Sequence, residues 1–146
     1  MATIVTRAGK GSALTWTEGD ANITNLNNDK LEKTGGTITG YKETIYDLGT
    51  TSGTITPNVA NGNVQTITLN GALTFSAFAS PLAGQSLTLI IKQDATGSRT
   101  LTSTMKFAGG ATTANKTLST AANSVDILSV VYDGTNYWAS LSKGFA

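Results

Sequence analysis

The sequence predicts an all-β protein, an antiparallel β-sandwich or jelly roll preceded by a short helical segment at the amino terminus. The first observation is composition, because Thr, Gly, Ser and Asn together make up 65 of the 146 residues. β-branched Thr favours strands, and Gly and Asn favour the tight turns that join them. The second is the pattern beyond Tyr41, where apolar residues alternate with polar ones between turn signals at near-regular spacing.

Seven to nine short strands are expected in this part of the chain. Asp133-Gly134 is the strongest hairpin signal, and Asn70-Gly71 and residues 94–97 also predict turns. The connections are too short to hold crossover helices, so mostly antiparallel pairing is expected. The expected strands span residues 43–48, 53–56, 64–69, 73–78, 85–93, 99–107, 116–119, 125–132 and 136–142.

A helix is expected near the amino terminus, over residues 16–33. Thr15 and Glu18 form a capping-box signature, in which each side chain accepts a hydrogen bond from the other residue's backbone amide. Trp16, Ile23 and Leu26 fall near one side of this helix. Its asparagines have low helix propensity, so the helix needs a packing surface, either on another chain or on its own β-domain.

The chain before and after this helix completes the predicted organisation. A short strand is expected at residues 3–6 and a loop at residues 8–12. The Gly- and Thr-rich stretch at residues 34–40 ends the helical pattern. The sequence therefore predicts an amino-terminal segment at residues 1–40, an extended arm plus a helix, and a β-sandwich domain at residues 41–146.

Composition excludes several classes of function. The chain has no His and no Cys, which removes the commonest general base, thiol nucleophiles and the usual zinc ligands. We therefore expect no enzyme activity, no metal site and no cofactor. A formal net charge of +1 gives no broad field for nucleic acid or anionic lipid, and no apolar stretch is long enough to cross a membrane.

A pair of carboxylates that cleaves a glycan is the enzymatic alternative. Such hydrolysis needs two carboxyl groups within roughly 5 to 10 Å of each other, and the β-domain offers Asp47, Asp94, Asp126 and Asp133. Asp94 and Asp133 lie in predicted turns, where Asp commonly bonds the backbone. Asp126 begins an apolar strand, where a bond to a loop amide would hold it. A structural role is therefore favoured for these residues.

Aromatic residues near the carboxyl terminus are the candidates for contact with a ligand or a second subunit. Tyr132, Tyr137 and Trp138 lie on the last two predicted strands, and Tyr46 is a further ring. Such rings stack on sugars or fill cores. Tyr137 and Trp138 are adjacent, so one of them faces out of the sandwich. That ring is expected to contact either a surface ligand or a neighbouring subunit.

The predicted surface is unusual for a free monomer. It is rich in Thr, and only 13% of the residues of the chain are charged. Monomeric β proteins normally protect their strand edges with charge. The sequence therefore predicts association with identical copies, which would cover these edges.

Two stretches near the amino terminus resemble a known family. Residues 2–15, ATIVTRAGKGSALT, and residues 20–28, DANITNLNN, look like the amino-terminal segment shared by many virion proteins of tailed bacteriophages, especially tail-fibre and fibre-like proteins. In that family the segment precedes unrelated distal domains, which implies an attachment module. The residues that the resemblance implies for attachment are Ile4, Arg7, Trp16, Ile23 and Leu26.

The rest of the chain extends this resemblance. The link LEKTGGTITG at residues 31–40 is similar to the Thr-Gly-Gly-Thr-x-x-Gly links of phage fibres. Residues 83–90, 96–101, 125–128 and 131–135 are similar to a recurrent β-domain pattern of phage proteins. The resemblance thus covers most of the chain.

The resemblance implies a non-enzymatic virion structural protein, a short fibre or spike on the tail or virion surface, with its β-domain exposed for host attachment. The alternative is a capsid decoration protein, or cement protein, that stabilises the phage head. The implied partners are identical copies in a homotrimer, other virion proteins of the tail, baseplate or capsid, and a glycan on the host surface. The implied location is the phage particle, assembled in the host cytoplasm, with no nucleic acid bound and no insertion into a membrane.

Overall fold

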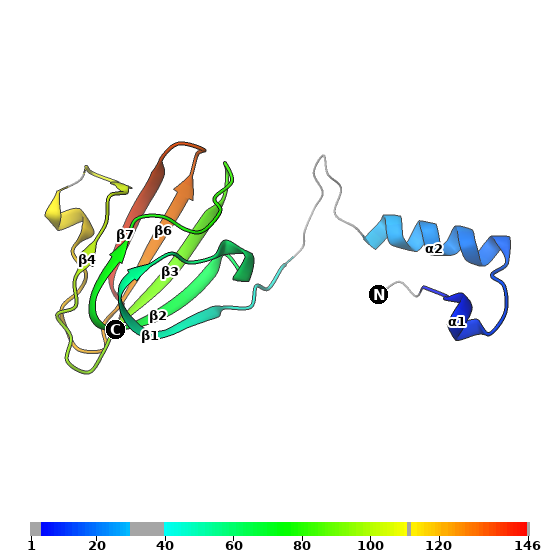
Figure 1. Ribbon diagram of the computed structural model, residues 1–146, viewed down its shortest axis with the longest axis horizontal. Helices are drawn as coiled ribbons and strands as arrows, with labels where there is room; N and C mark the ends of the chain where they lie inside the picture. The colour runs from blue at the N-terminus through cyan, green and yellow to red at the C-terminus, as the bar shows by residue number, and fades with distance from the viewer. Residues whose placement is uncertain (1–3, 30–39, 111, 146) are drawn as a thin grey trace. The chain divides into compact units, whose positions relative to one another are not determined.

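The computed structural model describes residues 4–29, 40–110 and 112–145, with the side chains of residues 25–29 outside the description. The chain divides into two compact units, Met1–Tyr41 and Lys42–Ala146. We call them the amino-terminal unit and the β unit, and each is described by itself (Figure 1). Among the described residues, no helix has the length and apolarity that crossing a bilayer requires.

Two helices form the amino-terminal unit, α1 (Arg7–Lys10) and α2 (Trp16–Asp29). The predicted capping box is confirmed, because the Glu18 amide donates to Thr15 Oγ1 at 3.2 Å and the Thr15 amide donates to Glu18 Oε2 at 2.7 Å. The expected helix over residues 16–33 is confirmed as far as Asp29. Residues 30–33 lie outside the described part of the chain.

The segment before α2 differs from the prediction. Most of the loop expected at residues 8–12 is the helix α1, because Thr6 Oγ1 caps it by accepting from the Gly9 amide at 3.0 Å. Residues 4–6 are not in a strand, and the start of the strand expected there lies outside the described residues. The reason is that both backbone groups of Val5 bond the side chain of Asn22 in α2, at 2.9 and 2.8 Å, and not a second strand.

Seven strands and two short 3₁₀-helices are described in the β unit, so the all-β prediction is confirmed. The strands make one mixed sheet in the order β1-β2-β3-β6-β7-β5, and β4 pairs with β2 off this path. In Figure 1, β3, β6 and β7 lie side by side. The elements are β1 (Tyr46–Ile55), η1 (Val59–Asn61), β2 (Val64–Phe75), β3 (Ser86–Gln93), β4 (Leu101–Thr102), β5 (Lys106–Phe107), η2 (Thr113–Lys116), β6 (Val125–Tyr132) and β7 (Tyr137–Phe145).

The sheet closes on itself through the segment that holds β4 and β5. At its start Leu101 pairs with Leu73 of β2, and at its end Phe107 pairs with Ala139 of β7. Two layers therefore enclose one core, as in a β-sandwich. The core consists of Ile67, Leu69, Leu73, Phe75, Phe78, Leu87, Leu89, Ile91, Leu101, Met105, Phe107, Leu118, Leu128, Val130 and Ala139.

The prediction of mostly antiparallel pairing is wrong. The pairs β3–β6 and β6–β7 are antiparallel, whereas β1–β2, β2–β3, β2–β4 and β5–β7 are parallel. Between β1 and β2, residues 56–63 return the chain to the start of the next strand with only the short turn η1. This connection contains no crossover helix, because its only regular element is the three-residue turn η1.

Two of the expected strand breaks are not breaks. The strands expected at residues 43–48 and 53–56 merge into β1, whose pairing with β2 shifts register near Gly49 and Gly53. Both glycines have φ near +80°, which is the conformation of a bulge and not of a chain reversal. β2 likewise continues through Asn70-Gly71, where its pairing with β1 shifts register. A Cβ at Gly71 would lie 2.8 Å from Ser52 Cβ, so this glycine allows β1 to approach closely.

Some of the remaining strand predictions are confirmed and others are not. The strands expected at residues 85–93, 125–132 and 136–142 are confirmed as β3, β6 and β7, with the hairpin at Asp133-Gly134 between the last two. In residues 99–107 the predicted alternation is present, although only β4 and β5 are paired. The strand expected at residues 116–119 is absent from the described structure, because Lys116 ends η2 and the next residues bond outside any ladder: Thr117 Oγ1 donates to the Thr113 carbonyl and the Ser119 amide donates to Asp126.

Candidate functional site

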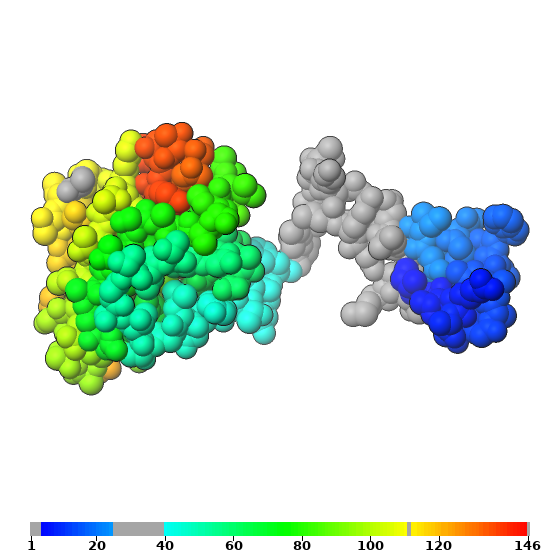
Figure 2. Space-filling model, in the orientation of Figure 1, coloured from blue at the N-terminus to red at the C-terminus, as the bar shows by residue number. Residues whose placement is uncertain are grey.

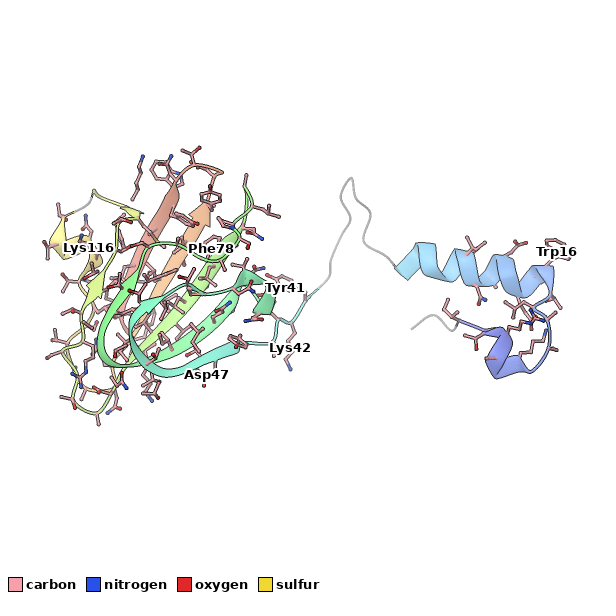
Figure 3. The ribbon with its side chains drawn as sticks, in the orientation of Figure 1. Trp16, Tyr41, Lys42, Asp47, Phe78 and Lys116 are labelled. Carbon is pink, nitrogen blue, oxygen red and sulfur yellow. The ribbon has the colours of Figure 1, made fainter. Side chains whose placement is uncertain are left out.

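The three aromatic residues near the carboxyl terminus lie on two faces of the sheet. Tyr132 and Tyr137 pair across the hairpin and pack on the buried ring of Phe78, which is labelled in Figure 3. The Phe78 and Tyr137 rings are 5.0 Å apart edge to face, and burial raises the pKa of the Tyr137 hydroxyl. Trp138, the next residue, points to the outer face. The outward ring of the adjacent pair is therefore Trp138.

Asp133 fixes the position of the Trp138 ring. The indole N–H donates to Asp133 Oδ2 at 2.6 Å, while Asp133 Oδ1 accepts from the amides of Thr135 and Asn136 at 2.8 and 2.7 Å. The hydrogen bonds from the Asn136 amide and then from Trp138 lower the pKa of Asp133 to about 2. On the neighbouring strand, Lys106 Nζ lies 5.1 Å from the centroid of the Trp138 ring, within cation–π range.

A groove of about 400 Å³ lies beside this ring, over β5, β6 and β7. Its lining is almost entirely carbon, and Lys106 is the only charged residue in it. Val131 pairs with Trp138 across the hairpin, and the two side chains are 47% and 48% exposed. Ser129 and Ser140 pair in the next row and are small, so they leave the groove open. We call these residues and Lys106 the Trp138 groove.

The residues predicted for attachment lie in the amino-terminal unit. Trp16 and Ile23 are 92% and 70% exposed, and their spacing of seven places them on one side of α2. The Trp16 ring projects from the first turn of α2 (Figure 3). Ile4 and Arg7 are also exposed, and the side chain of Leu26 lies outside the described residues. Four of these five residues are therefore accessible in the described structure.

Surface polar contacts hold this unit together. Lys10 pairs with Glu18, and the hydrogen bonds from Lys10 and from the Thr15 amide lower the pKa of Glu18 to about 2. Asn22 fastens the chain at Val5 to α2. No residue from 4 to 24 is buried. The described part of this unit therefore has no hydrophobic core of its own.

The four carboxylates considered for glycan cleavage each bond groups of the fold. Asp47 accepts from the Gly49 amide, and Asp94 pairs with Arg99, whose hydrogen bond lowers the pKa of Asp94. Asp126 is buried and accepts from the Ser119 amide at 2.7 Å, as its position had indicated. Among the described residues, no three His, Cys, Asp or Glu side chains lie close enough to hold a metal ion.

Sequence reasoning did not identify the other residues of the groove. Val131 and Ser129 could have been found from the Asp133-Gly134 hairpin, because counting back from the turn pairs them with Trp138 and Ser140. Lys106 gives no such local signal. It reaches Trp138 through the parallel pairing of β5 with β7, two segments about thirty residues apart in the chain.

The comparisons with known proteins point to the phage tail. A family described as Putative phage tail fibre C-terminal domain matches residues 54–137, from the end of β1 to the start of β7. No curated protein and no solved structure matches the chain. The resemblance seen at residues 2–28 lies outside the matched region. The match does not favour the capsid decoration alternative. It covers more than half of the chain, which therefore belongs to this family of phage tail fibre domains and is a structural component of the virion.

Proposed function

We propose that this tail fibre protein is a homotrimer held to the rest of the virion by its amino-terminal unit, with the β unit exposed for host attachment. We further propose that it acts without enzymatic activity and is assembled in the host cytoplasm. The observation that carries the attachment proposal is the surface of α2. Trp16 and Ile23 are exposed there, in a unit whose described residues form no core.

Such a unit needs a partner to be stable. α2 has 14 residues, a length at which an isolated helix is marginal in water. The contacts that fix its start, among them the Lys10–Glu18 pair, are at the surface, where ion pairs contribute little. Full burial of one large apolar side chain contributes about 1.5 to 3 kcal/mol. A virion protein that covers Trp16 and Ile23 would therefore both stabilise α2 and hold the fibre.

The proposed homotrimer rests on the β unit. Its strands carry Thr, Ser and apolar residues at the surface, and β1 is an open edge in the strand order. Open edges with little charge promote pairing with further chains. A closed symmetric oligomer covers such surfaces without growing into a filament.

The attachment proposal is tested in the phage that encodes this protein. We expect the double variant Trp16→Glu/Ile23→Glu to fall at least tenfold in copies per purified virion, measured by quantitative immunoblot against a capsid protein. Two buried carboxylates would oppose docking of α2. The matched control is Ala21→Glu, which adds a charge to the opposite side of α2 and should incorporate normally. Incorporation of the double variant at the wild-type level would contradict the proposal.

A further inference from the structure

The outer face of β3, β6 and β7 has the composition of a surface that contacts another molecule. Two neighbouring rows of paired residues cross it, Ser86, Val131 and Trp138 in one and Thr88, Ser129 and Ser140 in the next. None of these six side chains is charged, and the two large apolar ones are nearly half exposed. Exposed apolar patches of this kind mark interaction sites.

The Trp138 groove suits an apolar side chain of a protein better than a sugar. Asp133 and Lys106 already hold the indole ring, so contact with it costs little side-chain freedom. A sugar needs several hydrogen-bonding groups around it, and the lining of this groove is almost entirely carbon. The one charge at its rim is the ammonium of Lys106, which forms no salt bridge with any described residue.

The opposite end of the sheet carries a surface that complements this groove. Ile45 and Tyr46, where β1 begins, are 54% and 42% exposed. Asp47 follows and likewise forms no salt bridge among the described residues. In Figure 2 the residues around the start of β1, in cyan, lie at the surface of the β unit, and Figure 3 labels Asp47 beside that edge. Tyr46 pairs with the buried Gln65 and Asp47 pairs with Thr66, so Tyr46 faces the core side of the sheet, while Asp47 and Ile45 face the outer side. The apolar side chain of Ile45 and the carboxylate of Asp47 thus match a carbon-lined groove with an ammonium at its rim.

One copy of the chain cannot join these two surfaces. β1 and β7 are separated by β2, β3 and β6 in the strand order, so residues 45–47 cannot reach the groove of their own chain. We infer that residues 45–47 of one copy dock in the Trp138 groove of the next, an inference that rests on the proposed homotrimer. Such contacts between unlike surfaces close into a ring when the rotation between copies allows it. Three copies then bury three identical contacts.

The test uses the full chain and measures its mass in solution by light scattering at micromolar and higher concentrations. Val131→Glu places a charge in the groove, and Ile45→Glu places one in the docking segment. We expect each variant alone to be a folded monomer. The wild type and the control Thr102→Glu, on an exposed position of β4 outside both surfaces, should be trimers. Trp138→Ala and Asp47→Lys repeat the comparison if either first variant fails to fold.

Mixing the two variants distinguishes the inferred contact, which joins two different surfaces of neighbouring copies, from a contact in which the same surface of both copies meets. The Val131→Glu chain keeps an intact docking segment, and the Ile45→Glu chain keeps an intact groove. One productive contact therefore remains, and an equimolar mixture should form a dimer and nothing larger. A mixture that stays monomeric overturns the inference.

Two further results are decisive. Variants that remain trimers overturn the inference and leave the proposed homotrimer standing; if they also lose adsorption to host cells, the groove is a ligand site. A monomeric wild type overturns the homotrimer and the inference together.

Discussion

Asp133 connects the turn of the last hairpin to the ring that borders the groove. One of its carboxylate oxygens bonds two backbone amides and the other bonds Trp138. These hydrogen bonds favour the charged form and hold the pKa of Asp133 at about 2, below the 3.8 of an unperturbed Asp. A group whose pKa is lower in the folded state stabilises the fold above its unfolded pKa, and this stabilisation is lost as the pH falls toward the folded pKa.

We expect the melting temperature to stay level between pH 8 and pH 5, because the chain has no His or Cys to titrate there. It should then fall between about pH 4 and about pH 2, where Asp133 becomes protonated, and Asp94, whose pKa is also lowered, adds to the acid loss. Asp133→Asn should lower the melting temperature at pH 7 and make the acid fall smaller. Asp20→Asn, in the amino-terminal unit, is the control. An Asp133→Asn protein with the acid profile of the wild type would show that this carboxylate does not stabilise the hairpin.

At the scale of elements, the sequence was most informative where pairing is local. β6 and β7 could be predicted with their register because Asp133-Gly134 joins them by a tight turn. The capping box of α2 was predictable for the same reason, since its two residues are three positions apart. Alternation along β7 predicted that either Tyr137 or Trp138 faces outward, and the structure shows that it is Trp138.

The parts that escaped prediction depend on contacts distant in the chain. Asn70-Gly71 has the composition of a hairpin turn, yet the need for a residue without a side chain comes from Ser52 on β1. The parallel pairs β1–β2 and β2–β3 arise from extended returns of the chain that local patterns do not mark. The groove was missed in part because Lys106 joins it through such a pair.

The close approach at Gly71 gives a prediction for β1 and β2. Gly71→Ala should lower the free energy of unfolding by about 1 to 3 kcal/mol, since the added methyl group overlaps the Ser52 side chain. In the double variant Ser52→Gly/Gly71→Ala this overlap is gone, and most of the loss should be recovered apart from the cost of a third glycine in β1. Urea unfolding of the wild type, the two single variants and the double variant measures the coupling energy between positions 52 and 71. Losses that simply add would show that Ser52 does not determine the residue at position 71.

At the scale of the whole molecule, the chain joins two units of opposite character. The β unit has a core of fifteen buried apolar residues, and it contains the region that matches the tail fibre family. The described part of the amino-terminal unit has exposed apolar residues and no core. This difference supports the proposal that the amino-terminal unit attaches the β unit to the virion.

The measurement that tests this account most directly is the incorporation of a chain lacking residues 1–33 into virions. The truncated chain keeps every strand of the β unit, so it should show cooperative unfolding at the melting temperature of the full chain. In phage that express it in place of the full chain, it should be absent from purified particles. A folded truncated chain present at the wild-type copy number would contradict the account, because attachment would then reside in the β unit.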